Sequence, residues 1–183
     1  MTEQLPQCII CLRNHEQTTI EHIVPRSLGN IHYILRKGKV CRSCNNRFAR
    51  YESAVLTSER WLKKRQSYGV AKSELTPHRV EPDPLDLKRF LLKVCYESIY
   101  QSKPRLLKQY DFEPIREELA TGKEANCDLV MDKGLKDTKN VAGIIDRWRL
   151  GSNHIYLKYN DLDERIYFML RYGQLSNVLV LHF

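Results

Sequence analysis

The sequence predicts an α+β protein: a small amino-terminal unit stapled by paired cysteines, then a unit made of a helix and an antiparallel sheet. Three observations predict this class: two Cys-x-x-Cys pairs near the amino terminus, a proline-rich segment in mid-chain, and alternating apolar runs toward the carboxyl end. We expect the first unit to span residues 1–73, a connector to span residues 74–84, and the second unit to span residues 85–183.

Composition is typical of a folded chain. Of the 183 residues, 42% are hydrophobic and 28% charged, which is more apolar than disordered chains are. No stretch approaches the roughly 18 apolar residues of a membrane span, and the amino terminus lacks the apolar segment of a signal peptide. We therefore expect a cytoplasmic protein without a membrane partner.

Positive charge is concentrated in the first unit. Residues 1–73 contain 13 Lys and Arg against 5 Asp and Glu, whereas residues 74–183 contain 17 of each kind. Such a field suits a polyanion, because Lys and Arg release the counterions condensed on its phosphates. Nucleic acid is the first partner to consider, although a basic surface can also serve solubility alone.

Four cysteines form two pairs of equal spacing, Cys8-x-x-Cys11 and Cys41-x-x-Cys44. Two such turns complete the tetrahedral set of four thiolates that Zn²⁺ favours. Disulfides are the alternative, but the missing export signal favours metal binding. The spacing therefore predicts a structural Zn²⁺ rather than four independent buried thiols.

Local patterns predict strand, loop, strand and helix in the first unit. The β-branched residues of Thr18–Val24 predict a strand that ends near Pro25, and a second strand is expected to run into Val40-Cys41. Residues 26–39 between them have the glycines of a loop. From residue 45 to about residue 67, apolar side chains recur at helical spacing.

The second unit begins with a capped helix. Asp83 is placed to cap it, with Pro84 at its first position, and one apolar stripe continues to Ile99. A further helix is expected near residues 114–120. Cys95 and Cys127 are expected in the core. Apolar or alternating runs predict strands at residues 127–131, 155–159, 166–172 and 178–183.

The pair Glu21-His22 precedes Ile-Val-Pro, and Asn45 directly follows Cys44. In this order the residues resemble the HNH endonucleases, the ββα-metal or His-Me finger family, in their four-cysteine form, over residues 8–55. The resemblance implies metal-dependent hydrolysis of DNA phosphodiesters, double-stranded DNA being the expected substrate, with products bearing 5′-phosphate and 3′-hydroxyl ends. It also implies a structural zinc separate from one catalytic divalent ion.

The residue types suit this chemistry. His22 is the expected general base near neutral pH, and Glu21 and Asn45 offer the hard oxygen ligands that Mg²⁺ or Mn²⁺ prefer. Asn46 is the alternative ligand. In a regular strand Glu21 and His22 would point to opposite faces, so both reach one site only if the strand ends or bulges there.

Two further groups of residues follow from the resemblance. The family's middle asparagine, which holds the loop, is replaced by Arg36, so Asn30 or a shifted alignment must supply it. Six basic residues near the site are expected to contact DNA, although any single one could be a solvated surface charge: Arg26, Lys37, Lys39, Arg42, Arg47 and Arg50.

One alternative function remains open, a non-catalytic zinc-finger module that binds DNA or RNA. A single site of the HNH kind cuts one strand, so double-strand breaks would require a homodimer or two successive events. The remaining histidines lack ligand spacing, so we expect them to be structural: His15, His32, His78, His154 and His182.

Overall fold

In the computed structural model the polypeptide forms five α-helices and five strands in the described residues, which are 5–16, 20–130, 143–150 and 153–183. A 3₁₀ turn at Arg26–Leu28 precedes them. The helices are α1 (Arg42–Leu56), α2 (Glu59–Ser67), α3 (Pro84–Ser102), α4 (Leu106–Gln109) and α5 (Glu113–Thr121). The strands are β1 (Cys127–Val130), β2 (Gly143–Leu150), β3 (Asn153–Leu162), β4 (Arg165–Tyr172) and β5 (Leu175–His182).

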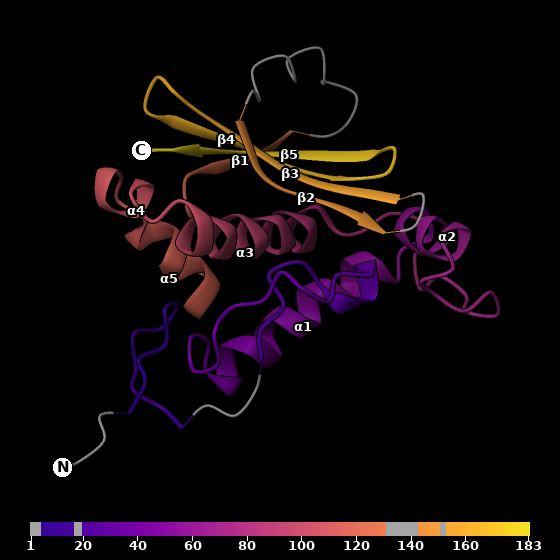
Figure 1. Cartoon of the computed structure of the whole chain (residues 1–183), viewed down its shortest axis with the longest axis horizontal. Coiled ribbons are helices and arrows are strands. Elements are labelled where there is room, and N and C mark those ends of the chain that lie inside the picture. Colours follow the sequence, from indigo (N-terminus) through magenta and orange to yellow (C-terminus); the bar gives the residue numbers. More distant parts are fainter. Residues whose placement is uncertain (1–4, 17–19, 131–142, 151–152) are drawn as a thin grey trace.

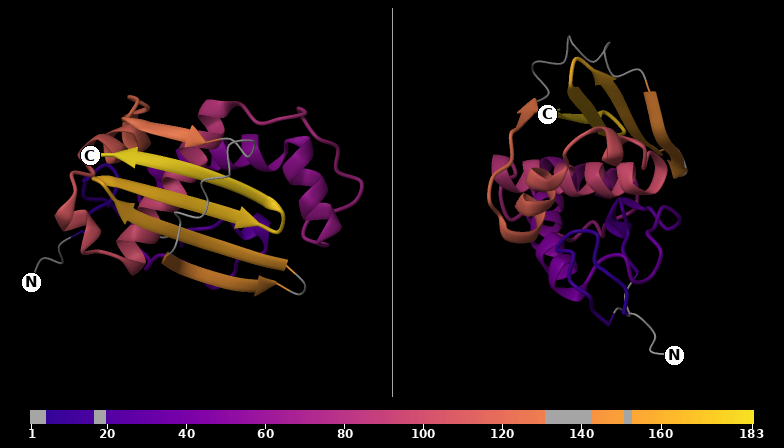
Figure 2. Two further views of the ribbon diagram at one scale, coloured as in Figure 1. Left: turned by 90° about the horizontal axis from the view of Figure 1, so that it is seen from above. Right: turned by 90° about the vertical axis from the view of Figure 1, so that its left-hand side faces the viewer.

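These elements lie in layers. The sheet forms one layer, α3 lies beneath it, and α1 with the amino-terminal loops lies on the far side of α3 (Figures 1 and 2). The five strands are antiparallel in the order β1-β5-β4-β3-β2. The predicted α+β class is confirmed.

Tight turns join the central strands. Leu162 pairs with Arg165, so β3 and β4 are connected by Asp163 and Glu164 alone. Both have positive φ, 53° and 57°, as a turn that matches the right-handed twist of the strands requires. The next turn contains Gly173 at φ 59°, where a Cβ atom would lie 1.9 Å from the hydroxyl of Tyr68. Only glycine fits there.

Four of the strands were predicted. Strands β1, β3, β4 and β5 overlap the expected runs, with Met131 outside the described residues. The pattern did not reveal β2, because charged residues interrupt its apolar ones in the sequence GIIDRWRL. It also did not reveal the single turn of α4.

Helix α3 begins as the sequence predicts. The Asp83 carboxylate accepts hydrogen bonds from the amides of Leu85 and Asp86, at 2.8 Å and 3.4 Å, and Pro84 takes the first position. Its middle turns are buried on every side, including Lys93 and Glu97, and not along one stripe only. The cause is its position between the sheet and α1 (Figure 2).

The single helix expected over residues 45–67 is wrong in its extent. The structure has α1 and α2, separated at Thr57 and Ser58. The Ser58 hydroxyl donates to the carbonyl of Val55 at 2.6 Å, and the next amide, of Glu59, donates to the carbonyl of Arg79 at 2.8 Å. These bonds replace helical ones, so the chain turns there.

The two predicted strands of the first unit are also wrong. No strand is assigned over residues 20–24 or at Val40-Cys41, and Thr18 and Thr19 lie outside the described residues. An isolated antiparallel bridge joins His22 to Ile34 instead. The second partner is therefore residues 33–35, and Val40 leads directly into α1.

One continuous hydrophobic cluster joins the two predicted units. It runs from Cys8 through α1 and α3 to Leu181 in β5. Trp61 of α2, for example, packs edge-on against Phe90 of α3 and stacks on Tyr172 of β4. The boundaries at residues 73 and 85 stay predictions. Among the described residues, we find no helix with the length and apolar character to cross a membrane.

Candidate active site and metal centre

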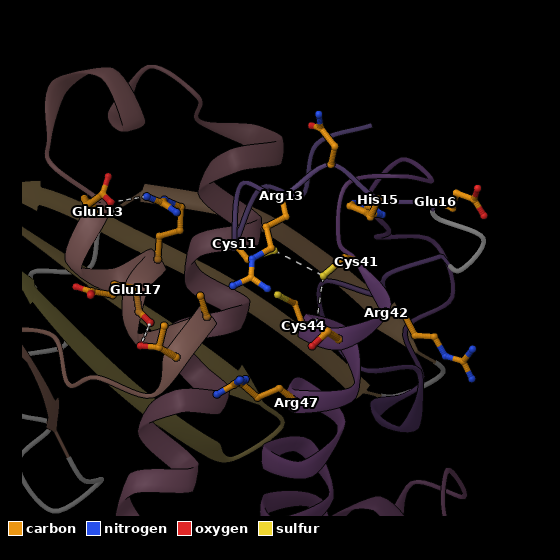
Figure 3. Close-up of a pocket in the computed structure, with 15 residues that line it drawn as sticks. Cys11, Arg13, His15, Glu16, Cys41, Arg42, Cys44, Arg47, Glu113 and Glu117 are labelled. Atoms are coloured by element: carbon orange, nitrogen blue, oxygen red, sulfur yellow. Dashed lines mark hydrogen bonds and ion pairs between the residues drawn. The ribbon is translucent and has the colours of Figure 1, made fainter. Parts of the chain in front are cut away.

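The four predicted zinc ligands come together. The sulfur atoms of Cys8, Cys11, Cys41 and Cys44 all lie within 4.8 Å of one another, and those of Cys11 and Cys41 are 3.7 Å apart (Figure 3). A tetrahedral Zn²⁺ with bonds of about 2.3 Å would separate its sulfur ligands by about 3.8 Å. The cluster therefore has the geometry that could hold a zinc ion.

Hydrogen bonds prepare the cluster for a cation. The Cys8 sulfur accepts from the amide of Cys41 at 3.4 Å. A hydrogen bond with the Cys44 thiol lowers the pKa of Cys8 although burial opposes the change, and the same bond raises the pKa of Cys44. Burial also raises the pKa of Cys11, so the cluster favours a thiolate at Cys8, and a bound divalent cation would favour the thiolate form of the other three.

Helices of the second unit support the first cysteine pair. The Tyr96 hydroxyl of α3 donates to the carbonyl of Ile9 at 3.0 Å, and the Arg116 guanidinium of α5 donates to that of Ile10 at 2.9 Å. Leu12, just after the pair, has a φ of 55°, a left-handed conformation that is strained for leucine. The second pair needs no such support, since Cys41 is the N-cap of α1.

A pocket of about 520 Å³ lies beside the cysteine cluster. Arg13 and Arg47 extend near the sulfur atoms, whereas Arg42 points away from them (Figure 3). Acidic Glu113 and Glu117 of α5 also line the pocket, where Glu113 pairs with Arg116 and Glu117 pairs with Lys123. The pocket is therefore lined by both basic and acidic side chains.

Glu21 is buried and ion-paired. Only 5% of it is exposed, and its Oε1 lies 2.6 Å from Nζ of Lys93, which α3 supplies. The same ammonium donates to the carbonyl of His22 at 2.6 Å. The predicted metal ligand therefore already has one cation beside it. A carboxylate has two oxygens, so this pairing is compatible with a second cation on the other one.

His22 is half-buried beside this ion pair. Its Nδ1 is buried and makes no hydrogen bond within the described part of the chain. Burial lowers the pKa of His22; the charge of Glu21 opposes this, and the charges of Lys93 and Arg26 add to it. The imidazole is consequently neutral at pH 7, as a general base must be.

Asn45 lies in the first turn of α1, where its amide donates to the carbonyl of Cys41 at 3.0 Å. It is half-buried and Asn46 is exposed. Glu52, which contacts Lys93, follows seven residues later on the same helix face, about 10 Å further along the axis. The structure therefore gathers Glu21, His22 and Glu52, with Asn45 nearer the cysteine cluster.

Asn30 holds the loop that precedes the bridge. It is only 2% exposed. Its amide nitrogen donates to the carbonyls of Val24 and Tyr33, at 2.6 Å and 3.0 Å, and its oxygen accepts from the amides of His32 and Tyr33. Arg36 is exposed. Asn30 thus fixes the conformation of this loop.

The six basic residues predicted to contact DNA lie on several surfaces. Arg26 is exposed and close enough to His22 to affect its pKa. Arg50 lines a pocket of about 530 Å³ with Arg79. Arg42 and Arg47 line the pocket at the cysteine cluster, and Lys37 and Lys39 line another that includes Tyr100.

Other predicted residues are where they were expected. Cys95 and Cys127 are buried, at 0% and 9% exposure. His182 lies 2.9 Å from the Asp128 carboxylate. The side chain of His154 lies outside the described residues.

Sequence reasoning missed Lys93, Glu97 and Glu52. A weak signal was present, because Lys93 and Glu97 are four residues apart in a helix whose neighbouring positions are apolar. Charged side chains in such a helix are buried only when they are paired. Their partners on other elements could not be found from spacing.

Residues 8–58 match the family model described as HNH endonuclease. This segment contains all four cysteines of the cluster together with Glu21, His22 and Asn45, so the resemblance inferred from the sequence is confirmed there. Searches of curated proteins and of solved structures found no match.

Proposed function

We propose that the protein is a metal-dependent endonuclease that hydrolyses DNA phosphodiester bonds. The observation that carries this proposal is His22: a half-buried imidazole of lowered pKa, with Nδ1 free of hydrogen bonds within the described residues, inside the segment that matches the HNH family. A neutral imidazole beside acidic and basic side chains suits proton abstraction from water.

Each residue has one task in the proposed reaction. His22 takes a proton from the attacking water. Glu21 and Asn45 hold a Mg²⁺ or Mn²⁺ ion, with Asn46 as the alternative to Asn45. When bound, that ion neutralises charge on the phosphoryl oxygens and on the departing 3′ oxygen. Arg26, exposed beside His22, is suited to contact a substrate phosphate.

Zinc and DNA complete the proposal. Zn²⁺ on Cys8, Cys11, Cys41 and Cys44 holds the start of α1 against the turn that contains Cys8 and Cys11. The positive charge of residues 1–73 supports DNA as the substrate, with Lys37, Lys39, Arg42, Arg47 and Arg50 as further phosphate contacts. One site cuts one strand, so a double-strand break needs a homodimer or two events.

A second candidate is a zinc module that binds DNA or RNA without cutting it. The ion pair between Glu21 and Lys93 favours this alternative, because a buried, paired carboxylate has a structural role of its own. The two candidates differ in their need for His22, which a binding module does not require.

The test is plasmid nicking by the His22→Ala variant in Mg²⁺ and in Mn²⁺, with DNA binding and zinc content measured on the same samples. His182→Ala is the matched control, since His182 lies in β5 and contacts Asp128 of β1. We expect His22→Ala to keep zinc and DNA binding and to lose nicking, whereas His182→Ala keeps all three. Unchanged nicking by His22→Ala would reject His22 as the base.

A further inference from the structure

The ammonium of Lys93 is enclosed by oxygen atoms from three parts of the chain. Lys93 comes from the middle of α3 and is 1% exposed. Five oxygens lie within 3.2 Å of its Nζ: Glu21 Oε1 and the His22 carbonyl at 2.6 Å, Glu52 Oε1 at 3.0 Å, and the Ile23 carbonyl and Glu97 Oε2 at 3.2 Å.

The partners contribute unequally. The two shortest contacts are to Glu21 and to the carbonyl of His22, the proposed metal ligand and the proposed base. Glu97 lies at 3.2 Å, but neither of its oxygens has hydrogen-bond geometry to any partner in the described residues. Burial raises the pKa of Glu97 well above its ordinary value, although the charge of Lys93 opposes the change, so Glu97 neither orients the ammonium nor adds much negative charge. The hydrogen bonds of Lys93 are therefore directed at residues 21–23 and at Glu52.

Residues 21–23 have little other support. Their pairing consists of the His22–Ile34 bridge with two flanking backbone hydrogen bonds, and no strand is assigned to them. Such a segment can shift easily, since few backbone hydrogen bonds resist its movement. Lys93 adds three contacts to it from a helix that is itself packed between the sheet and α1.

We propose that Lys93 is a positioning residue for phosphodiester hydrolysis. Its ammonium fixes the direction of the Glu21 carboxylate and the place of the His22 backbone, so that one carboxylate oxygen and the imidazole face the same site. This inference rests on the proposed function. It also assigns a role to the second unit, whose central helix supplies the residue.

The test compares Lys93→Met with Glu97→Gln, because both change a single side chain within the same buried group. We expect Lys93→Met to reduce the nicking rate about 100-fold, the effect of displacing a catalytic group by about 1 Å, and to change the Mn²⁺ concentration that gives half-maximal rate. Glu97→Gln should stay within about 3-fold of the parent, because Glu97 orients nothing. Zinc content and melting temperature are measured for each variant.

Two further variants make the result decisive. Lys93→Met in the Glu97→Gln background removes the Lys93–Glu97 contact without leaving the residue 97 carboxyl group unpaired, which keeps the comparison valid if Lys93→Met alone fails to fold. Glu21→Gln with Lys93→Met tests the route of the effect. If Lys93 acts through Glu21, the double variant nicks no more slowly than Glu21→Gln alone.

The outcomes separate the two proposals. A parent protein without nicking in any divalent metal overturns the nuclease and Lys93 as its positioning residue together. If the parent is active and folded Lys93 variants nick at the parental rate with the parental Mn²⁺ dependence, the positioning role of Lys93 is overturned and the nuclease proposal stands. Independent, multiplying effects of Lys93→Met and Glu21→Gln on the rate also overturn it.

Discussion

The backbone of the amino-terminal segment and the backbone of the sheet are held in place by different interactions. In the sheet, backbone groups pair along continuous ladders from β1 to β2. In the described part of residues 5–41 the backbone makes two isolated bridges and scattered turn hydrogen bonds. Side chains add further links: four sulfur atoms, the amide of Asn30 and the ammonium of Lys93. A segment held by side chains can place reactive groups where a regular ladder could not.

The two regions also differ in what they contribute to the core and to the candidate active site. Most of the main apolar core lies from α3 onward. The candidate active-site residues Glu21, His22, Asn45 and Glu52 lie in residues 21–52, and Lys93 of α3 is the exception. A rigid layer thus supports an irregular one. Four substitutions test how far the two depend on each other.

The largest effect is expected for the metal. Cys41→Ala should lose zinc and unfold the amino-terminal segment, because structural zinc supplies on the order of 10 kcal/mol of folding free energy in small modules. Hydrogen exchange should show the largest loss of protection in residues 5–58, with a smaller loss in β4 and β5, because one hydrophobic cluster joins the two layers. Cys127→Ala is the control, since Cys127 is buried outside the cluster. A Cys41→Ala protein that melted like the parent without zinc would refute the structural-metal claim.

The second effect concerns the sheet. Phe168→Ala should destabilise the protein by about 3–5 kcal/mol, because Phe168 is fully buried in β4. Denaturant unfolding would measure the loss, with zinc release followed in the same titration. Since one hydrophobic cluster joins the layers, we expect zinc release and sheet unfolding at the same denaturant concentration. Release at clearly different concentrations would show that the layers unfold separately.

The third effect concerns the buried amide. Asn30→Ala should cost about 2–3 kcal/mol, because it leaves buried backbone groups of Val24 and Tyr33 without partners. Nicking should fall as well, since the loop leads into the bridge at His22. Asn14→Ala, an exposed position, is the matched control. Equal stability of the two variants would remove Asn30 from this role.

The smallest expected effect is a gain in stability. Leu12→Gly should stabilise the protein by about 0.5–1 kcal/mol, because glycine adopts the left-handed conformation without strain. Leu12 is 45% exposed, so little packing is lost. Melting temperature in the presence of zinc would show the gain. A lower melting temperature would mean that the leucine side chain contributes more than its strain costs.

Spacing alone determined the chemistry-bearing part of this protein. Each Cys-x-x-Cys turn places its two sulfur atoms on one side, and the cap at Asp83 and the alternation of β4 are equally local. The predictions that were wrong concerned where the helix and the strands of the amino-terminal segment begin and end. The helix predicted over residues 45–67 is interrupted at Ser58, where the Ser58 hydroxyl and the amide of Glu59 form hydrogen bonds that replace helical ones. His22 pairs with Ile34 because the side chain of Asn30 shapes the loop between them.

Tertiary structure decided what surrounds Glu21. From the sequence it is an acid beside a histidine; in the folded chain it is a buried carboxylate paired with a lysine 72 positions away. No spacing rule links those residues, because their meeting depends on how α3 packs between the sheet and α1. Local hydrogen bonds and metal geometry act over a few residues and can be predicted from sequence, whereas the partner of a buried charge is chosen by the packing of whole layers.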